Sequence, residues 1–228
     1  CCKMKKISSS EIKDILDKWV SSVGSGRYVP SDYTENLDES FSITENFGIQ
    51  QVKLEIHKFI DVLLKQKKLQ NCLEIGLGFY GSTHFLWRLL FEKTITIENQ
   101  KDRVFKFGEN MNKFHNKFMF KDMKSSFIFG SSHNPSSVEK LEKILDGKKL
   151  DLLFIDGDHT YKSVLSDWLL YNDFVEKDGI IAFDDCESNC NNYGVQKLLN
   201  KLGSFDNSIN LHKINDSKNQ GIAYYYKQ

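Results

Sequence analysis

The sequence lacks a net charge, a long apolar run and any low-complexity tract. Its 31 Lys and Arg residues balance its 31 Asp and Glu residues, so no global field would attract nucleic acid or an anionic membrane. No apolar segment approaches the roughly 18–20 residues that span a bilayer, and nothing resembles a signal peptide. We therefore expect a cytoplasmic protein without nucleic-acid or membrane partners.

The five cysteines do not form a metal-binding pattern. Cys72 lies in an apolar strand pattern and is expected in the core. Cys186 and Cys190 are close in sequence, but no second pair and no matching His spacing accompany them, so a zinc site is not favoured. A reducing environment is the default expectation.

The N-terminal part, residues 1–69, is predicted to be a helical extension. Residues 8–22 combine a Ser cap, a Glu in the first turn and apolar residues at helical spacing. Residues 47–69 carry the apolar face of a second helix. Between them, residues 24–46 are polar and without a clear period, and a loop of that length is usually a lid, a binding loop or disorder.

From residue 70 onward, short apolar strands alternate with amphipathic helices. Strands are predicted at 71–75, 94–97, 126–129, 150–155 and 179–183, and helices at 82–91, 100–117, 135–145, 160–177 and 195–202. Residues 209–214 and 222–226 are predicted to form a closing hairpin. This alternation predicts an α/β fold with a doubly wound, mostly parallel sheet whose last strand or two run antiparallel.

Two of the predicted strands end in carboxylates. Asp156 follows the first of them, and Asp184 and Asp185 follow the second. Because neighbouring parallel strands end at the same edge of a sheet, we expect the three acids to converge there beside His159. Like charges that close require a cation or a proton, and hard oxygen ligands suit Mg²⁺ or Mn²⁺ better than zinc.

A metal-free reading of these residues stays open. In it, Asp156 caps a strand end and Asp184 and Asp185 are turn residues. Asp158 is either a second base or a cap for the following helix, and His159 is either a base or a plain first-turn histidine. We expect His57, His84, His115, His133 and His212 to be structural or exposed.

A glycine turn, Gly76-x-Gly78-x-x-Gly81, follows the first strand of the alternation and opens a helix. Such a turn lets backbone N–H groups approach a cofactor at the positive end of the helix. Glu98 ends the next strand, where a carboxylate accepts hydrogen bonds from both ribose hydroxyls of an adenosine. The pattern fits a dinucleotide as well as S-adenosylmethionine.

Two features favour S-adenosylmethionine over NAD. Glu74 stands two residues before Gly76, where an acid would repel a pyrophosphate but not a cationic amino-acid cofactor. In addition, about seventy residues of helical preamble precede the first strand.

Together these motifs resemble class I S-adenosylmethionine-dependent methyltransferases. The segments 74–78, Glu98, 155–159 and 179–185 are most similar to metal-dependent O-methyltransferases that act on macrolide sugars, grouped with cephalosporin-hydroxylase-like proteins, and more distantly to catechol O-methyltransferases. The resemblance covers roughly residues 45–226. It implies a Rossmann-like, seven-stranded sheet with the cofactor over the ends of the first two strands. We expect two parts in the chain, a helical extension and lid at residues 1–69 and a methyltransferase domain at residues 70–228.

The resemblance also implies the roles of particular residues. The methionine part of the cofactor would lie at Glu74 and the glycine turn, the ribose at Glu98 and the adenine near the third strand. The implied cofactor-binding residues are Glu74, Gly76, Gly78, Ser82, Glu98, Ser131, Ser132 and Asp156. Asp156, Asp184 and Asp185 would hold magnesium or manganese, although many relatives have another residue at the position of Asp184. His159, with Asp158 beside it, would act as the base.

The predicted function is Mg²⁺-dependent O-methylation of a small polyhydroxylated acceptor, such as a sugar or a glycosylated precursor. Two alternatives remain. An NAD(P)-dependent oxidoreductase shares the glycine turn but gives no role to three converging acids. A non-catalytic adenosine-binding relative would keep the fold without turnover. Residues 24–48 and the loop after Cys186 would select the acceptor, whose identity the sequence does not give, and homo-oligomerisation stays open.

Overall fold

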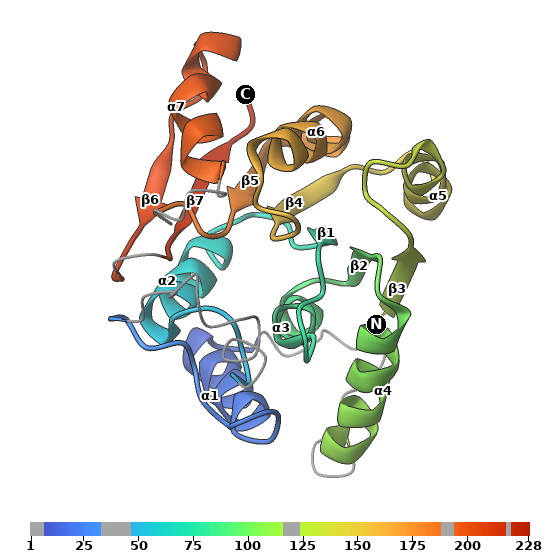
Figure 1. Ribbon diagram of the computed structural model, residues 1–228, viewed down its shortest axis with the longest axis vertical. Helices are drawn as coiled ribbons and strands as arrows, with labels where there is room; N and C mark the ends of the chain where they lie inside the picture. Colours follow the sequence, from blue (N-terminus) through green and yellow to red (C-terminus); the bar gives the residue numbers. More distant parts are fainter. Residues whose placement is uncertain (1–6, 33–46, 116–123, 188–193, 218–219) are drawn as a thin grey trace.

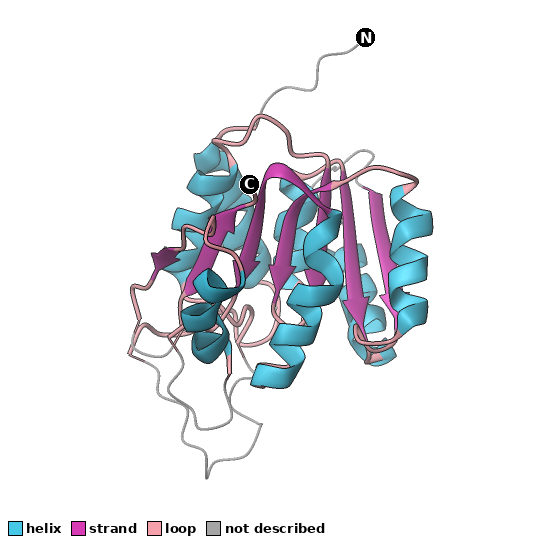
Figure 2. Ribbon diagram, turned by 90° about the horizontal axis from the view of Figure 1, so that it is seen from above, coloured by secondary structure: helices cyan, strands magenta, loops and turns pink. Residues whose placement is uncertain are grey.

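The computed structural model describes residues 7–32, 47–115, 124–187, 194–217 and 220–228. In these ranges the chain forms one seven-stranded sheet between two layers of helices (Figures 1 and 2). The predictions made for residues 33–46 and for Cys190 concern residues outside these ranges.

The sheet has the strand order β3-β2-β1-β4-β5-β7-β6. The first five of these pair in parallel, while β7 runs antiparallel to both β5 and β6. The strands are β1 (Asn71–Ile75), β2 (Lys93–Glu98), β3 (Lys124–Phe129), β4 (Leu150–Ile155), β5 (Val175–Phe183), β6 (His212–Ile214) and β7 (Ile222–Tyr226). The predicted doubly wound sheet with an antiparallel end is confirmed.

Helices cover both faces of the sheet because the central strands are apolar on both sides. One face carries α1 (Ser9–Val20), α2 (Lys53–Leu63), α3 (Ser82–Leu90) and α4 (Lys101–His115). The other carries α5 (Pro135–Leu145), α6 (Tyr161–Tyr171) and α7 (Val195–Phe205). No helix in the described ranges is long and apolar enough to cross a membrane. Cys72 is fully buried in the core, as predicted.

The helices that precede residue 70 share a core with the sheet. Trp19 of α1 stacks on Phe85 of α3, with ring centroids 4.3 Å apart. Its indole N–H also donates to the Ser82 hydroxyl over 2.8 Å. The N-terminal helices thereby fix the position of α3, whose first residue follows the glycine turn.

The boundaries of α2, α6 and β5 differ most from the prediction. Helix α2 begins at Lys53, so residues 47–51 form bends, and Val52 makes a β-bridge to Val29. Helix α6 ends at Tyr171, and β5 begins at Val175. Residues 176–177, predicted at the end of the helix, and residue 178, predicted between helix and strand, belong to β5, where their side chains are exposed to solvent.

Candidate active site

The carboxyl ends of β1, β4 and β5 are held side by side by backbone hydrogen bonds. The Asp156 N–H donates to the Ile75 carbonyl over 2.9 Å, and the Asp184 N–H donates to the Ile155 carbonyl over 3.0 Å. Asp185 then adopts a left-handed conformation with φ of 54°. The chain thus turns away from the sheet just after β5. The three predicted aspartates lie together in one polar cluster.

Two side chains connect the aspartates. Gln51 Nε2 donates to Asp156 Oδ2 and to Asp184 Oδ2, each over 3.0 Å. The His159 ring lies between Asp156 and Asp185, with Nε2 3.3 Å from Asp156 Oδ1 and Nδ1 3.3 Å from Asp185 Oδ2. The sequence analysis identified His159 but not Gln51.

The cluster concentrates negative charge in a buried place. Asp184 is 3% exposed and Asp185 is 8% exposed. Burial, followed by the charges of Asp156 and Asp185, raises the pKa of Asp184 well above its usual value. Burial also raises the pKa of Asp156, against the opposing contact with His159. These carboxylates are therefore stabilised by any proton or cation placed between them.

His159 supplies positive charge to the cluster. Burial lowers its pKa, but the charge of Asp185 and the contact with Asp156 outweigh that effect and raise the pKa to about 9. The backbone is fixed as well, because the Gly194 N–H at the start of α7 donates to the His159 carbonyl over 2.6 Å. His159 thus carries a proton at neutral pH in this arrangement.

The hydrogen-bond donors to Asp158 come from the start of α6 and the loop before it. The Asp158 carboxylate accepts hydrogen bonds from the Thr160 N–H and from the Ser163 hydroxyl, at 3.1 and 2.6 Å. Burial acts to raise the pKa of Asp158, but these hydrogen bonds outweigh it and hold the pKa below its usual value. The N-cap of α6 is Thr160, and Asp158 binds this residue and Ser163 beside it. A role of Asp158 as a second base stays a prediction.

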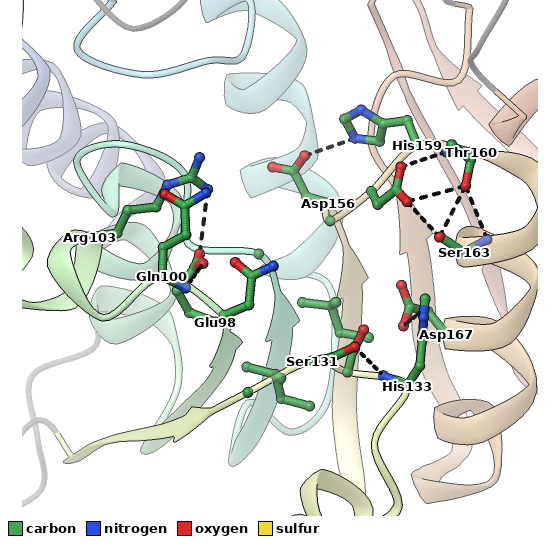
Figure 3. A pocket seen from close by; sticks show the side chains of 18 residues that line it. Glu98, Gln100, Arg103, Ser131, His133, Asp156, His159, Thr160, Ser163 and Asp167 are labelled. Atoms are coloured by element: carbon green, nitrogen blue, oxygen red, sulfur yellow. Dashed lines mark hydrogen bonds and ion pairs between the residues drawn. The ribbon is translucent and has the colours of Figure 1, made fainter.

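A cavity of about 530 Å³ opens beside the cluster. Figure 3 shows Glu98, Gln100 and Arg103 on one wall, and Asp156 and His159 on the opposite wall. Ser131, Ser132 and His133, which follow β3, close the remaining side. The volume lies within the range of roughly 300–1,000 Å³ typical of small-molecule sites.

Glu98 is oriented by the glycine turn. Its carboxylate accepts the Leu77 N–H over 2.9 Å and the Gln100 N–H over 2.7 Å. Gly76, with φ of 91°, packs so closely on β4 that an added Cβ would lie 2.1 Å from the Asp156 carbonyl oxygen. Only glycine therefore lets the turn reach this edge of the sheet.

Two predicted cofactor residues, Gly78 and Ser82, lie away from the larger cavity. Gly78 and Ser82 line a smaller cavity with residues 47–51, and Asp156 borders both cavities. The Ser82 hydroxyl donates to the Gly48 carbonyl and accepts the indole N–H of Trp19. Their roles at the cofactor stay predictions.

Glu74 is fully buried on the α3 side of β1. It accepts hydrogen bonds from Trp87 Nε1 over 2.9 Å and from the Thr96 hydroxyl over 2.7 Å. Glu74 lines neither cavity. The charge of Glu74 nevertheless acts on Asp156, which lines the larger cavity. The role of Glu74 at the methionine part of the cofactor stays a prediction.

The larger cavity also includes a pair that the sequence analysis missed. His133 Nε2 lies 3.2 Å from Oδ1 of Asp167, which is 1% exposed and comes from α6. Burial raises the pKa of Asp167 to about 6. His84, by contrast, is structural as expected, since its ring is buried between Thr96 and Ser125.

The donor set of the cluster suits a hard divalent cation. Three carboxylates supply oxygen ligands, and the Gln51 amide oxygen is buried without a hydrogen-bond partner. As the side chains stand, no three His, Cys, Asp or Glu residues in the described ranges are arranged around a common point. With the His159 ring between Asp156 and Asp185, binding of a cation requires that ring to turn aside.

The fold and the site define a class of protein. A seven-stranded doubly wound sheet, with a glycine turn after β1 and an acid ending β2, is the architecture of class I S-adenosylmethionine-dependent methyltransferases. A family model described as "Methyltransferase domain" matches residues 73–186, half of the chain. The chain therefore belongs to this methyltransferase-domain family.

Known proteins resemble the chain in sequence and in fold. An uncharacterised protein of Acanthamoeba polyphaga mimivirus is 34% identical over 94 residues, which span 41% of this chain and only 42% of that protein. An O-methyltransferase from Bacillus cereus, solved with S-adenosylhomocysteine, shares 13% identity and a TM-score of 0.56 over 99% of this chain and 94% of its own.

A second similar structure is the MycE methyltransferase of the mycinamycin biosynthetic pathway, solved with Mg, S-adenosylhomocysteine and mycinamycin VI. It shares 13% identity and a TM-score of 0.53 over 75% of this chain and 48% of its own. At these identities both structures establish the shared fold.

We expect the His159 imidazole to titrate with a pKa of about 9 in protein freed of divalent cations, because the charges of Asp185 and Asp156 favour its protonated form. Asp185→Asn should lower this pKa, since it removes the largest contribution that raises it. Proton NMR of the imidazole resonances against pH measures both values, and His159→Gln assigns the signal. A wild-type pKa at or below the ordinary value of about 6.5 would contradict this assignment.

Proposed function

We propose that the chain catalyses cation-dependent O-methylation of a small hydroxylated acceptor, with S-adenosylmethionine as the donor. The observation that carries the proposal is the cluster of Asp156, Asp184, Asp185 and His159. Two of its members, Asp156 and His159, line a cavity whose opposite wall holds Glu98. An oxidoreductase site would give no role to three converging aspartates.

The donor is proposed to lie in the larger cavity. Glu98 would accept hydrogen bonds from the ribose hydroxyls, and Ser131 and Ser132 would lie beside the adenine. Gly76 leaves the space in which the amino-acid part passes the sheet edge. In support, the Bacillus cereus and MycE structures, which share this fold, were both solved with S-adenosylhomocysteine.

The chemistry that remains for the chain is to orient the acceptor and remove its proton. As the oxygen–carbon bond forms, the carbon–sulfur bond breaks, its electron pair stays on sulfur, and the acceptor proton passes to a base. His159 is the proposed base, because it borders the cavity within 3.3 Å of Asp156.

Asp156, Asp184 and Asp185 are proposed to hold Mg²⁺ or Mn²⁺. Such a cation supplies Lewis-acid chemistry by lowering the pKa of a bound hydroxyl. The cation would also change the protonation of His159. With a pKa of about 9, His159 is already protonated at neutral pH and cannot accept a further proton. A cation bound to Asp156 and Asp185 would lower the pKa of His159 and leave the neutral imidazole free to act as a base.

The acceptor is proposed to be a polyhydroxylated molecule such as a sugar or a glycosylated precursor. Support comes from MycE, which was solved with Mg and mycinamycin VI. A non-catalytic adenosine-binding role is the remaining alternative. Measured methyl transfer would exclude it.

Glu98→Ala should weaken binding of S-adenosylhomocysteine by roughly 1.5–3 kcal/mol, the usual worth of hydrogen bonds to a charged group. Isothermal titration calorimetry measures the change. Glu98→Gln is the matched control, because it keeps one acceptor oxygen and should lose less. If NADH binds and S-adenosylhomocysteine does not, the proposed donor is wrong.

Chelation should abolish methyl transfer, and Mg²⁺ or Mn²⁺ should restore it, while S-adenosylhomocysteine binding survives. Asp156→Asn and Asp185→Asn should also lose turnover, because an amide oxygen lacks the negative charge of a carboxylate and binds a hard cation more weakly. Asp146→Asn is the control, since Asp146 is an exposed left-handed residue at the end of α5, a conformation that Asn tolerates. Full turnover in EDTA would favour the metal-free alternative.

His159→Gln should reduce turnover by about 10²–10⁴, the range for a positioned base. The affinities for S-adenosylhomocysteine and for Mn²⁺ should stay within a few-fold, and the acid limb of the rate–pH profile should disappear. His212→Gln is the control, because His212 stacks on Tyr224 and lines neither cavity. Near-normal turnover with an unchanged profile would remove His159 from the mechanism and make Asp158 the next base to test.

A further inference from the structure

Gln51 occupies an unusual position above the aspartate cluster. It is 2% exposed, and Nε2 bridges Asp156 and Asp184, which lie 105 and 133 residues farther along the chain. Its amide oxygen, Oε1, is buried and has no hydrogen-bond partner among the residues that the structure describes. A buried carbonyl oxygen is normally satisfied, so this atom needs a partner that is absent from the described contacts.

The backbone holds Gln51 firmly in this place. The Val29 N–H donates to the Gln51 carbonyl over 3.3 Å, and Val52 forms a parallel bridge with Val29. The flanking side chains of Ile49 and Val52 are buried. The amide group is therefore fixed against the aspartates by its surroundings, and rotation about its own terminal bond is the simplest change open to it.

The distances around Nε2 match those of a cation shell. In an octahedral site with Mg–O bonds of about 2.0–2.1 Å, adjacent ligand atoms lie about 2.9 Å apart. Nε2 lies 3.0 Å from Asp156 Oδ2 and 3.0 Å from Asp184 Oδ2. The two ends of an amide are nearly the same size, so a half-turn places Oε1 at this ligand-like spacing from both carboxylates.

We propose that Gln51 is a fourth protein ligand of the divalent cation, binding through Oε1 together with the aspartates. This inference rests on the proposed function, which places the cation at Asp156, Asp184 and Asp185. Without the cation, Nε2 donates to the carboxylates; with it, the amide turns and its unsatisfied oxygen gains a partner. One side chain thus serves both states of the cluster.

A ligand at position 51 would also connect the cation to the glycine turn. Residues 47–51 line the smaller cavity together with Gly78, and an added Cβ on Gly78 would lie 2.8 Å from Gln50 Oε1. Binding of the cation would therefore hold the segment before α2 against this turn.

The test is Mn²⁺ binding by electron paramagnetic resonance, carried out without donor or acceptor. We expect Gln51→Ala to weaken Mn²⁺ affinity at least about 10-fold, the lower end of the loss seen even for outer-shell partners. Gln51→Glu keeps an oxygen at the same place and should bind Mn²⁺ at least as tightly as the wild type. Its melting temperature should also rise more on addition of Mn²⁺.

Gln220→Ala is the matched control, because the Gln220 amide oxygen is also buried without a hydrogen-bond partner and its backbone contacts Glu187. This variant should keep wild-type affinity. If the wild type binds Mn²⁺ and Gln51→Ala binds it equally well, the ligand assignment is wrong while the cation site stands. If the wild type binds no Mn²⁺, the cation itself is refuted. Weak binding by Gln51→Glu would likewise overturn the role of Oε1.

Discussion

Two backbone hydrogen bonds, from Asp156 to Ile75 and from Asp184 to Ile155, set the condition on which the rest of the site depends. They align the ends of three adjacent strands and so force three carboxylates into a buried space. The repulsion between these carboxylates must be offset. His159 and Gln51 do this with a positive charge and with N–H groups, and the raised pKa of Asp184 shows that the compensation is incomplete.

Much of this arrangement could be predicted from local sequence. Apolar runs that end in acids identified β4 and β5, and parallel pairing then placed Asp156, Asp184 and Asp185 at one edge. Glu98 was found in the same way, from its position at the end of β2. Such predictions succeed because strand ends and turns are encoded by neighbouring residues, and the sheet converts them into proximity.

Other parts of the site could not be predicted, because they depend on contacts between distant segments. Gln51 was assigned to a helix that in fact begins at Lys53, and its aspartate partners lie more than 100 residues away. Asp167 looked like one polar residue of an amphipathic helix. Glu74 lies in a strand buried on both faces, where apolar periodicity does not reveal which face meets the ligand.

Gly76 packs directly against Asp156, so the proposed donor-binding part of the site and the acid cluster are in contact. Gly76 belongs to the turn that positions Glu98, and Asp156 belongs to the acid cluster, yet no room for even one methyl group separates them. Displacement on either side is transmitted directly to the other. Free-energy changes from substitutions in the two halves should therefore be non-additive, so a double-mutant cycle across this contact would report mechanical coupling even where no charge is altered.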